Sequence, residues 1–203
     1  MTKITAAEVN KLRKHTGAGM MDCKKALVEA EGDFDTAIEI LRKKGQKVAA
    51  KRSDREATEG VVLGKASGNK ATIISLACET DFVAKTDGFT GFANDLLDLA
   101  LENAPNSIEE LLGLGYNGGT VAEAITEQTG KTGEKIEVAG LETVEGDTAV
   151  AYNHPGNKVG AIAALNKGGF DDQARDVAMQ AAAMAPVALN KEEVPEDVIA
   201  KEI

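Results

Sequence analysis

The chain contains one structural unit twice, and the two copies differ in length at one place. A Gly-Asn-Lys triplet begins at Gly68 and again at Gly156, 88 positions later, and each triplet lies between two runs that predict β-strands. The helix-like run that follows ends in Ala-Pro at Ala104 and again at Ala185, only 81 positions later. The first copy therefore has seven additional residues, and they fall in the turn between its second strand and its helix.

The additional residues carry side chains that a simple turn does not need. The second copy makes the connection with LNKGGF at 165–170, whereas the first copy has CETDFVAKTDGF at 78–89. Insertions into surface loops cost little stability and often carry function. Phe82 could be a core residue and Asp81 the cap of a short turn, but Phe82 falls outside the alternation of the preceding strand. We therefore treat Asp81 and Phe82 as candidate functional residues.

The N-terminal part of the chain predicts a small bundle of three helices. A capping box formed by Thr5 and Glu8 starts the first helix, which ends near Thr16. The second helix places Met20, Cys23, Leu27 and Ala30 on one stripe, and one of the adjacent Met20 and Met21 must point away from it as a soft contact surface. The third helix, capped by Asp33, ends before Gly45.

The rest of the chain predicts an α+β core with antiparallel strands. Residues 46–57 are polar and basic and form either a helix or a solvated linker. Expected strands occupy 58–79 as a hairpin, 136–144, a run that starts at Thr148 and ends before the Gly156-Asn157 turn, and 159–165. Expected helices occupy 91–101, 108–114, 120–129 and 171–184. The predicted domains are a head with its linker at 1–55, a first core half at 56–147, and a second half at 148–203. The last of these includes a helix after Pro195 that starts without finishing, as expected of a truncated chain.

The charge is distributed unevenly along the sequence. Residues 1–55 hold 13 Lys and Arg against 8 Asp and Glu, while the remainder holds 10 against 25. The acidic remainder argues against nucleic-acid binding, because affinity for the nucleic-acid backbone needs many contacts between basic side chains and phosphates. A basic head on an acidic body better fits contact with an acidic protein surface. No signal peptide or apolar run of membrane-spanning length is present, so we expect a cytoplasmic protein without membrane association.

No enzyme motif is complete. Gly130-Lys131-Thr132 imitates the end of a phosphate-binding loop, but the position that requires the first glycine is Ile125. His15 and His154 lie in different regions, with one cysteine near each region, so no zinc-binding set forms. Catalytic carboxylates cannot be distinguished among the many Asp and Glu residues. We therefore expect no active site, no metal and no cofactor. His154, which precedes the second Gly-Asn-Lys turn, is either an ordinary turn residue or a contact.

Two motifs resemble the signatures of one protein family. LRKHTGAGMMDCKKAL at 12–27 resembles the N-terminal signature of bacterial elongation factor Ts, and TDFVAK at 80–85 resembles its second signature. The motifs are specific and lie in the family's order and spacing, and the resemblance covers the whole chain. It implies a three-helix head similar to a ubiquitin-associated domain, followed by a core of two related α+β halves.

The resemblance also implies a function and a set of contacts. The family promotes release of GDP from the GTPase elongation factor Tu, which it binds in GDP-bound and nucleotide-free forms. By resemblance, Thr80, Asp81, Phe82 and Val83 enter near the partner's Mg²⁺ and switch region. The other implied contacts are Arg13, Met20 and Met21 on the nucleotide-binding domain, His154 on a more distant domain, and Gly133.

This sequence departs from the family pattern in two places. Thr132-Gly133 stands where the family commonly has Ile-Gly, and Ala139-Gly140 replaces a basic pair that often follows. The family's helical hairpin after the second half is expected to start where this chain ends. Homo-dimerisation of the complex stays open. Two other hypotheses also stay open: a binding module that recognises a ubiquitin-like or ribosomal partner without exchange, and an enzyme with dispersed carboxylates.

Overall fold

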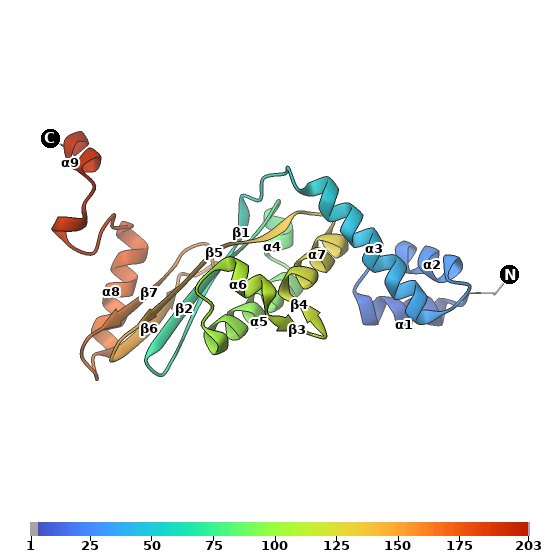
Figure 1. Ribbon diagram of the computed structural model, residues 1–203, viewed down its shortest axis with the longest axis horizontal. Coiled ribbons are helices and arrows are strands. Elements are labelled where there is room, and N and C mark those ends of the chain that lie inside the picture. The colour runs from blue at the N-terminus through green and yellow to red at the C-terminus, as the bar shows by residue number, and fades with distance from the viewer. Residues whose placement is uncertain (1–3, 203) are drawn as a thin grey trace.

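The protein is elongated, and its computed structural model describes residues 4–202 (Figure 1). A helical head lies at one end and is formed by α1 (Ala6–Thr16), α2 (Met20–Glu29) and the first part of α3 (Phe34–Arg52). The two halves of the core follow along the long axis, and α9 (Glu196–Glu202) lies at the opposite end. The expected α+β class, with its helical head and antiparallel strands, is confirmed.

The head is built by the local signals that the sequence contains. The capping box forms, since the Thr5 N–H donates to Glu8 Oε2 at 2.7 Å and the Glu8 N–H donates to Thr5 Oγ1 at 3.3 Å. Gly17 ends α1 with a φ of 69°, a conformation that favours glycine. The three helices enclose their own apolar cluster, whose buried residues are Val9, Leu12, Cys23, Ala26, Leu27, Ala30 and Ala37. The prediction that Met20 lies on the apolar stripe of the second helix is wrong, because its side chain is 50% exposed and does not join this cluster.

The third helix continues past Gly45 to Arg52, so the prediction that it stops before Gly45 is wrong. Gly45 is buried because α3 packs there on α7 (Val121–Thr132), where it faces Gly130. A glycine within a helix costs roughly 1 kcal/mol relative to alanine, but here it lets two helix backbones touch. Residues 46–52 are therefore helix, and of the expected linker only the short segment 53–58 connects the head to the first strand.

The first half of the core is built on a three-stranded antiparallel sheet. β1 (Glu59–Ser67) and β2 (Lys70–Cys78) form the predicted hairpin around Gly68-Asn69, and β5 (Ile136–Glu145) pairs with the other edge of β2. One face of the sheet packs against α5 (Asp87–Asn103) and carries most of the core. The remaining elements of this half are α4 (Asp81–Ala84), α6 (Ile108–Gly113), α7 and a small hairpin of β3 (Gly115–Tyr116) and β4 (Gly119–Thr120) that the sequence did not predict.

The second half repeats the hairpin and the helix. β6 (Thr148–Asn153) and β7 (Gly160–Leu165) pair antiparallel, and α8 (Asp171–Met184) packs on them; a short 3₁₀ turn, η1 (Lys191–Glu193), precedes α9. This hairpin lies on the face of β1 and β2 that α5 leaves free, giving the layers α5, sheet, hairpin and α8. The two strand layers approach closely at Gly64, where an added Cβ would lie 3.1 Å from the Cβ of Ala151.

The two halves share the order of their elements and the way their helices end. α5 and α8 both end at an alanine before proline in the left-handed conformation, Ala104 with φ 45° and Ala185 with φ 45°. Such a conformation is uncommon for a residue other than glycine. In the second half α8 starts directly after Phe170, whereas in the first half the additional residues form α4 ahead of α5.

Candidate partner-binding surface

The inserted segment forms one exposed helical turn at the end of β2. Thr80 caps α4, because its hydroxyl oxygen accepts from the Val83 N–H at 3.4 Å. Ala84 is buried and anchors the turn in the core, while Phe82 is 81% exposed. Phe82 is therefore not a core residue, and Thr80 rather than Asp81 is the cap. The insertion thus presents a large aromatic side chain that the rest of the protein leaves almost uncovered.

Asp81 lies next to Phe82 within a small group of opposite charges. Its carboxylate accepts from the Lys85 ammonium at 2.6 Å, and this bond holds the pKa of Asp81 below its usual value. Lys158 is the lysine of the second Gly-Asn-Lys triplet. Its charge also lowers the pKa of Asp81, and it pairs with Glu59 at the start of β1. The fold therefore brings the turn of the second half beside the insertion of the first half.

The second hairpin is attached to the edge of β1 near this turn. The side chain of Asn153 accepts from the Gly64 N–H at 2.7 Å and donates to the Gly64 carbonyl at 2.9 Å. The Asn157 carbonyl accepts from the Val62 N–H at 2.7 Å. These bonds occupy backbone groups of an edge strand, and they fix Lys158 near the insertion.

The base of the insertion is held by residues that the sequence did not single out. The Glu134 carboxylate accepts from both the N–H and the hydroxyl of Thr80, at 3.0 and 2.7 Å. The Glu79 carboxylate accepts from Arg52 Nη1 at 2.8 Å and from the Lys135 N–H at 2.7 Å. No sequence signal marks these partners, because Glu134 lies 54 positions from Thr80 and Arg52 lies 27 positions from Glu79.

Cys78 closes the same region from within the core. Its thiol is buried and donates to the Thr80 carbonyl at 3.2 Å. Burial raises the pKa of Cys78 to about 11, and the nearby Glu134 carboxylate adds to the rise. The thiol is therefore protonated at neutral pH and acts as a packing residue rather than a nucleophile.

The predicted contacts of the head are exposed, and the loop between α1 and α2 lies against one end of α7. Met21 is 63% exposed at the start of α2, so both methionines, and not one of them, are at the surface; Arg13 is exposed on α1. The Lys131 side chain lies against Gly17, where an added Cβ would be 3.1 Å from Lys131 Cε. Lys131 is in the last turn of α7, which Gly133 ends with a φ of 75°. The glycine loop before Met20 and the end of α7 are therefore neighbours.

His154 lies at the turn of the second hairpin, where its side chain faces α8. It is exposed, and its Nδ1 lies 2.9 Å from the Tyr152 hydroxyl. Both side chains line an open hollow of about 640 Å³ between the second hairpin and α8, together with Val159 and Met179. The structure thus places the predicted contacts in three areas: the head with the end of α7, the insertion, and this hollow.

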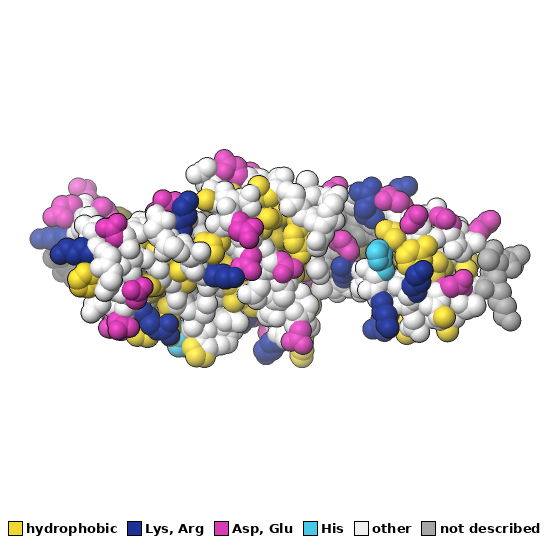
Figure 2. All heavy atoms as spheres, turned by 90° about the horizontal axis from the view of Figure 1, so that it is seen from below, with side chains coloured by type: hydrophobic (Ala, Val, Ile, Leu, Met, Phe, Trp, Pro, Cys, Tyr) yellow, Lys and Arg dark blue, Asp and Glu magenta, His cyan; other side chains and the backbone are white. Residues whose placement is uncertain are grey.

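Charged side chains of both signs cover the surface. Figure 2 shows Lys, Arg, Asp and Glu side chains around an apolar patch on the head, and both kinds of charge along the rest of this face of the molecule. Within residues 4–202, no group of three or more His, Cys, Asp and Glu side chains is arranged to hold a metal ion. In the same residues, no helix combines the length and apolar character needed to cross a membrane.

Comparison with known proteins decides the family. A family model described as "Elongation factor TS" matches residues 79–203, more than half of the chain. The chain belongs to the elongation factor Ts family. Its resemblance to that family in the two signature motifs is thereby confirmed, and the second motif lies within the matched residues.

Elongation factor Ts proteins of several bacteria align with the chain along its whole length, head included. The protein of that name from Christiangramia forsetii is 57% identical over 100% of this chain and 75% of its own length. The one from Bacteroides thetaiotaomicron is 52% identical over 98% of this chain, and the one from Rhodopirellula baltica is 49% identical over 100% of it. The chain spans 61% and 63% of the length of these last two relatives.

Proposed function

We propose that this protein is a translation elongation factor that binds elongation factor Tu and promotes the release of its GDP. The observation that carries the proposal is Phe82, an 81% exposed aromatic at the tip of an insertion that only one half of the repeat contains. In the proposed complex Asp81 and Phe82 enter beside the Mg²⁺ and phosphate site of the partner, flanked by Thr80 and Val83. The chain acts by binding and has no active site of its own, and its place of action is the cytoplasm.

The energetics set what the insertion must supply. A GTPase holds GDP through Mg²⁺ and backbone N–H groups at a helix N-terminus. An exchange factor weakens GDP binding by as much as GDP weakens the binding of the factor. Shifting a partner from 1:99 to 99:1 in favour of the open state requires about 5.5 kcal/mol of differential affinity. Complete burial of a phenylalanine contributes roughly 1.5–3 kcal/mol, so Phe82 supplies at most about half of this amount.

The remaining affinity comes, in this proposal, from the other two areas. The head, assigned to residues 1–55, contributes Arg13, Met20 and Met21, with Gly133 beside them at the end of α7. The first core half, 56–147, presents the insertion, and the second half, 148–203, contacts a more distant part of the partner through His154. Contacts in three areas of an elongated molecule allow the factor to hold its partner while the insertion disturbs the nucleotide site.

The test is the rate at which labelled GDP leaves elongation factor Tu with and without the protein. Phe82→Ala should slow catalysed release, with unchanged stability because the side chain is exposed. Phe170→Ala is the matched control, since Phe170 is also exposed, at 41%, and also precedes the helix of its half. If the wild-type chain binds elongation factor Tu without speeding release, it is a binding module, and the proposal is wrong. Equal rates of GDP release with the wild-type chain and with Phe82→Ala would exclude a role for the Phe82 side chain in exchange.

A further inference from the structure

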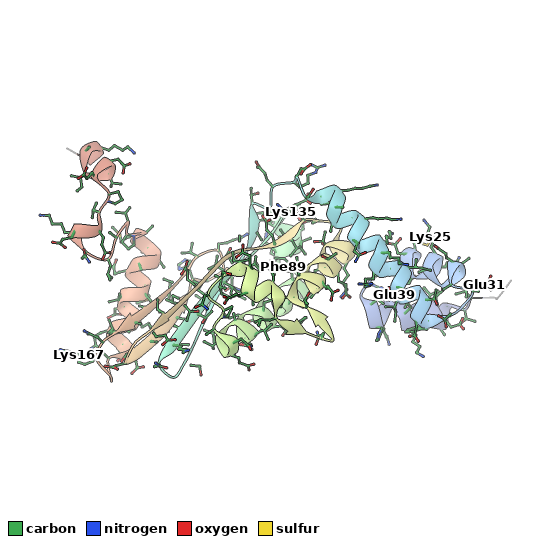
Figure 3. The ribbon with its side chains drawn as sticks, viewed as in Figure 1. Lys25, Glu31, Glu39, Phe89, Lys135 and Lys167 are labelled. Carbon is green, nitrogen blue, oxygen red and sulfur yellow. The ribbon has the colours of Figure 1, made fainter. Side chains whose placement is uncertain are left out.

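Three consecutive residues at the base of the insertion are each held by a hydrogen bond. Cys78 donates to the Thr80 carbonyl, Glu79 accepts from Arg52 and Lys135, and Thr80 donates twice to Glu134. Their distant partners come from the end of α3 and from the junction of α7 and β5. Figure 3 labels Lys135 at this junction, next to the end of α3.

Glu134 makes the most direct of these contacts. One oxygen accepts the Thr80 N–H and the other accepts the Thr80 hydroxyl, at 3.0 and 2.7 Å. Thr80 is also the residue whose hydroxyl oxygen caps α4. The position of Glu134 therefore fixes both the backbone and the side chain of the residue from which the exposed turn starts. Bidentate bonds to a carboxylate are strong and fix orientation as well as distance.

The side chains of Asp81 and Phe82 do not themselves pack on the core. Phe82 is exposed, and Asp81 is bonded to Lys85 of the same turn, an internal pair that does not attach it to the core. The buried Ala84 and the partly buried Val83, both of which pack on the core, hold the far end of the turn. The near end is held through Glu134 and, one residue earlier, through the Arg52–Glu79 pair, in which the Glu79 side chain is only 15% exposed.

We propose that Glu134 is a positioning residue for nucleotide exchange. It holds Thr80 so that Asp81 and Phe82 project in the direction that the nucleotide site of the partner requires. The inference rests on the proposed function, and it adds that Arg52 and Glu79 attach the same base to α3, the helix that carries the head. Docking of the head and entry of the insertion are therefore linked through one rigid path.

The test compares Glu134→Ala with Glu145→Ala over a range of factor concentrations. Glu145 lies at the other end of β5 and pairs with Lys70 on the surface at 2.8 Å, so its loss removes one carboxylate away from the insertion. Glu134→Ala should lower the maximal rate of catalysed GDP release roughly 10- to 100-fold, as expected when a reacting geometry is misplaced by about 1 Å. The half-saturating concentration should change much less. Glu145→Ala should leave both quantities unchanged.

A merely structural role gives a different pattern. If Glu134→Ala only unfolded a fraction of the protein, more protein would be needed for half-saturation but the maximal rate would be retained, and this result would overturn the inference. Glu134→Gln, which keeps one acceptor oxygen and the side-chain size, should give an intermediate maximal rate. If Glu134→Ala fails to fold, Glu134→Gln provides the test in its place. A wild-type maximal rate for a folded Glu134→Gln variant would then contradict the positioning role of Glu134.

A double variant tests whether Glu134 acts through the insertion. In the Phe82→Ala background, Glu134→Ala should slow release much less than it does in the wild-type background, because the group it orients is already absent. An equal effect in both backgrounds would contradict the positioning role. Failure of the inference is distinct from failure of the proposed function, since in the second case the wild-type chain itself would not accelerate release.

Discussion

Alanine at Gly130 is expected to strain the contact between α3 and α7, whereas alanine at Gly45 is expected to be tolerated in the same contact. A Cβ at Gly130 would lie 2.6 Å from the Cα of Gly45, a backbone atom that cannot rotate away. A Cβ at Gly45 would lie 3.6 Å from the Gly130 Cα and 3.6 Å from the Thr126 carbonyl oxygen, which is ordinary contact. The two substitutions therefore add the same methyl group, but only the one at Gly130 clashes with the facing helix.

The magnitudes follow from this geometry. Each substitution gains roughly 1 kcal/mol from helix propensity, because both glycines lie within helices. Gly130→Ala must also move α3 and α7 apart by about 1 Å to reach carbon–carbon contact distance, and such overpacking typically costs about 1–3 kcal/mol. The free energy of unfolding should therefore differ by about 2 kcal/mol between the variants, with Gly45→Ala the more stable. For a chain of this size that corresponds to roughly 4–8 °C in Tm.

Urea unfolding followed by far-UV circular dichroism measures the difference, since the chain contains no tryptophan. Hydrogen exchange adds the location: amides of 46–52 should exchange faster in Gly130→Ala and no faster in Gly45→Ala. Equal stabilities within about 0.5 kcal/mol, with equal exchange in α3, would refute the view that the two glycines are there for close helix packing. In the exchange assay, Gly130→Ala should also weaken binding of elongation factor Tu, because the head contacts are displaced.

Three further predictions concern pH, domain structure and ligands. The pKa of Cys78 rises from 9.0 in an unfolded chain to about 11 on burial, so the stability it contributes is present below pH 9 and is lost toward pH 11; urea titrations should show a smaller alkaline loss in Cys78→Ala. Burial also raises the pKa of Tyr116 to about 12, so stability falls further at still higher pH, and this second loss should persist in Cys78→Ala. Deletion of residues 1–55 should leave a folded core, because the head and the core have separate apolar clusters, but with a lower Tm since α7 loses the cover of α3; complete unfolding would contradict this division. Calorimetry of the isolated chain with GDP or Mg²⁺ should be flat, and Mg²⁺ should oppose complex formation with elongation factor Tu; micromolar binding of either to the chain alone would contradict the proposed mechanism.

Sequence alone determined the features that depend on neighbouring residues. The capping box at Thr5, the hairpin turn at Gly68 and the strand and helix of the second half all lie where local patterns predict them, because caps, turns and periodic burial are encoded within one or two turns of chain. The comparison of the two repeats also identified the insertion, and the exposure of Phe82 excludes the alternative that it is a core residue.

Tertiary structure alone decided the features in which distant segments meet. Gly45 has the sequence character of a helix end, yet it lies within α3, because its partner Gly130 allows close packing of two backbones. The pair of hydrogen bonds from Thr80 to Glu134 likewise has no local signature, since the sequence does not show which of its many glutamates accepts them. Local patterns specify which residues can end a helix or hold a loop, but the free energy of packing between remote segments selects which of them do so.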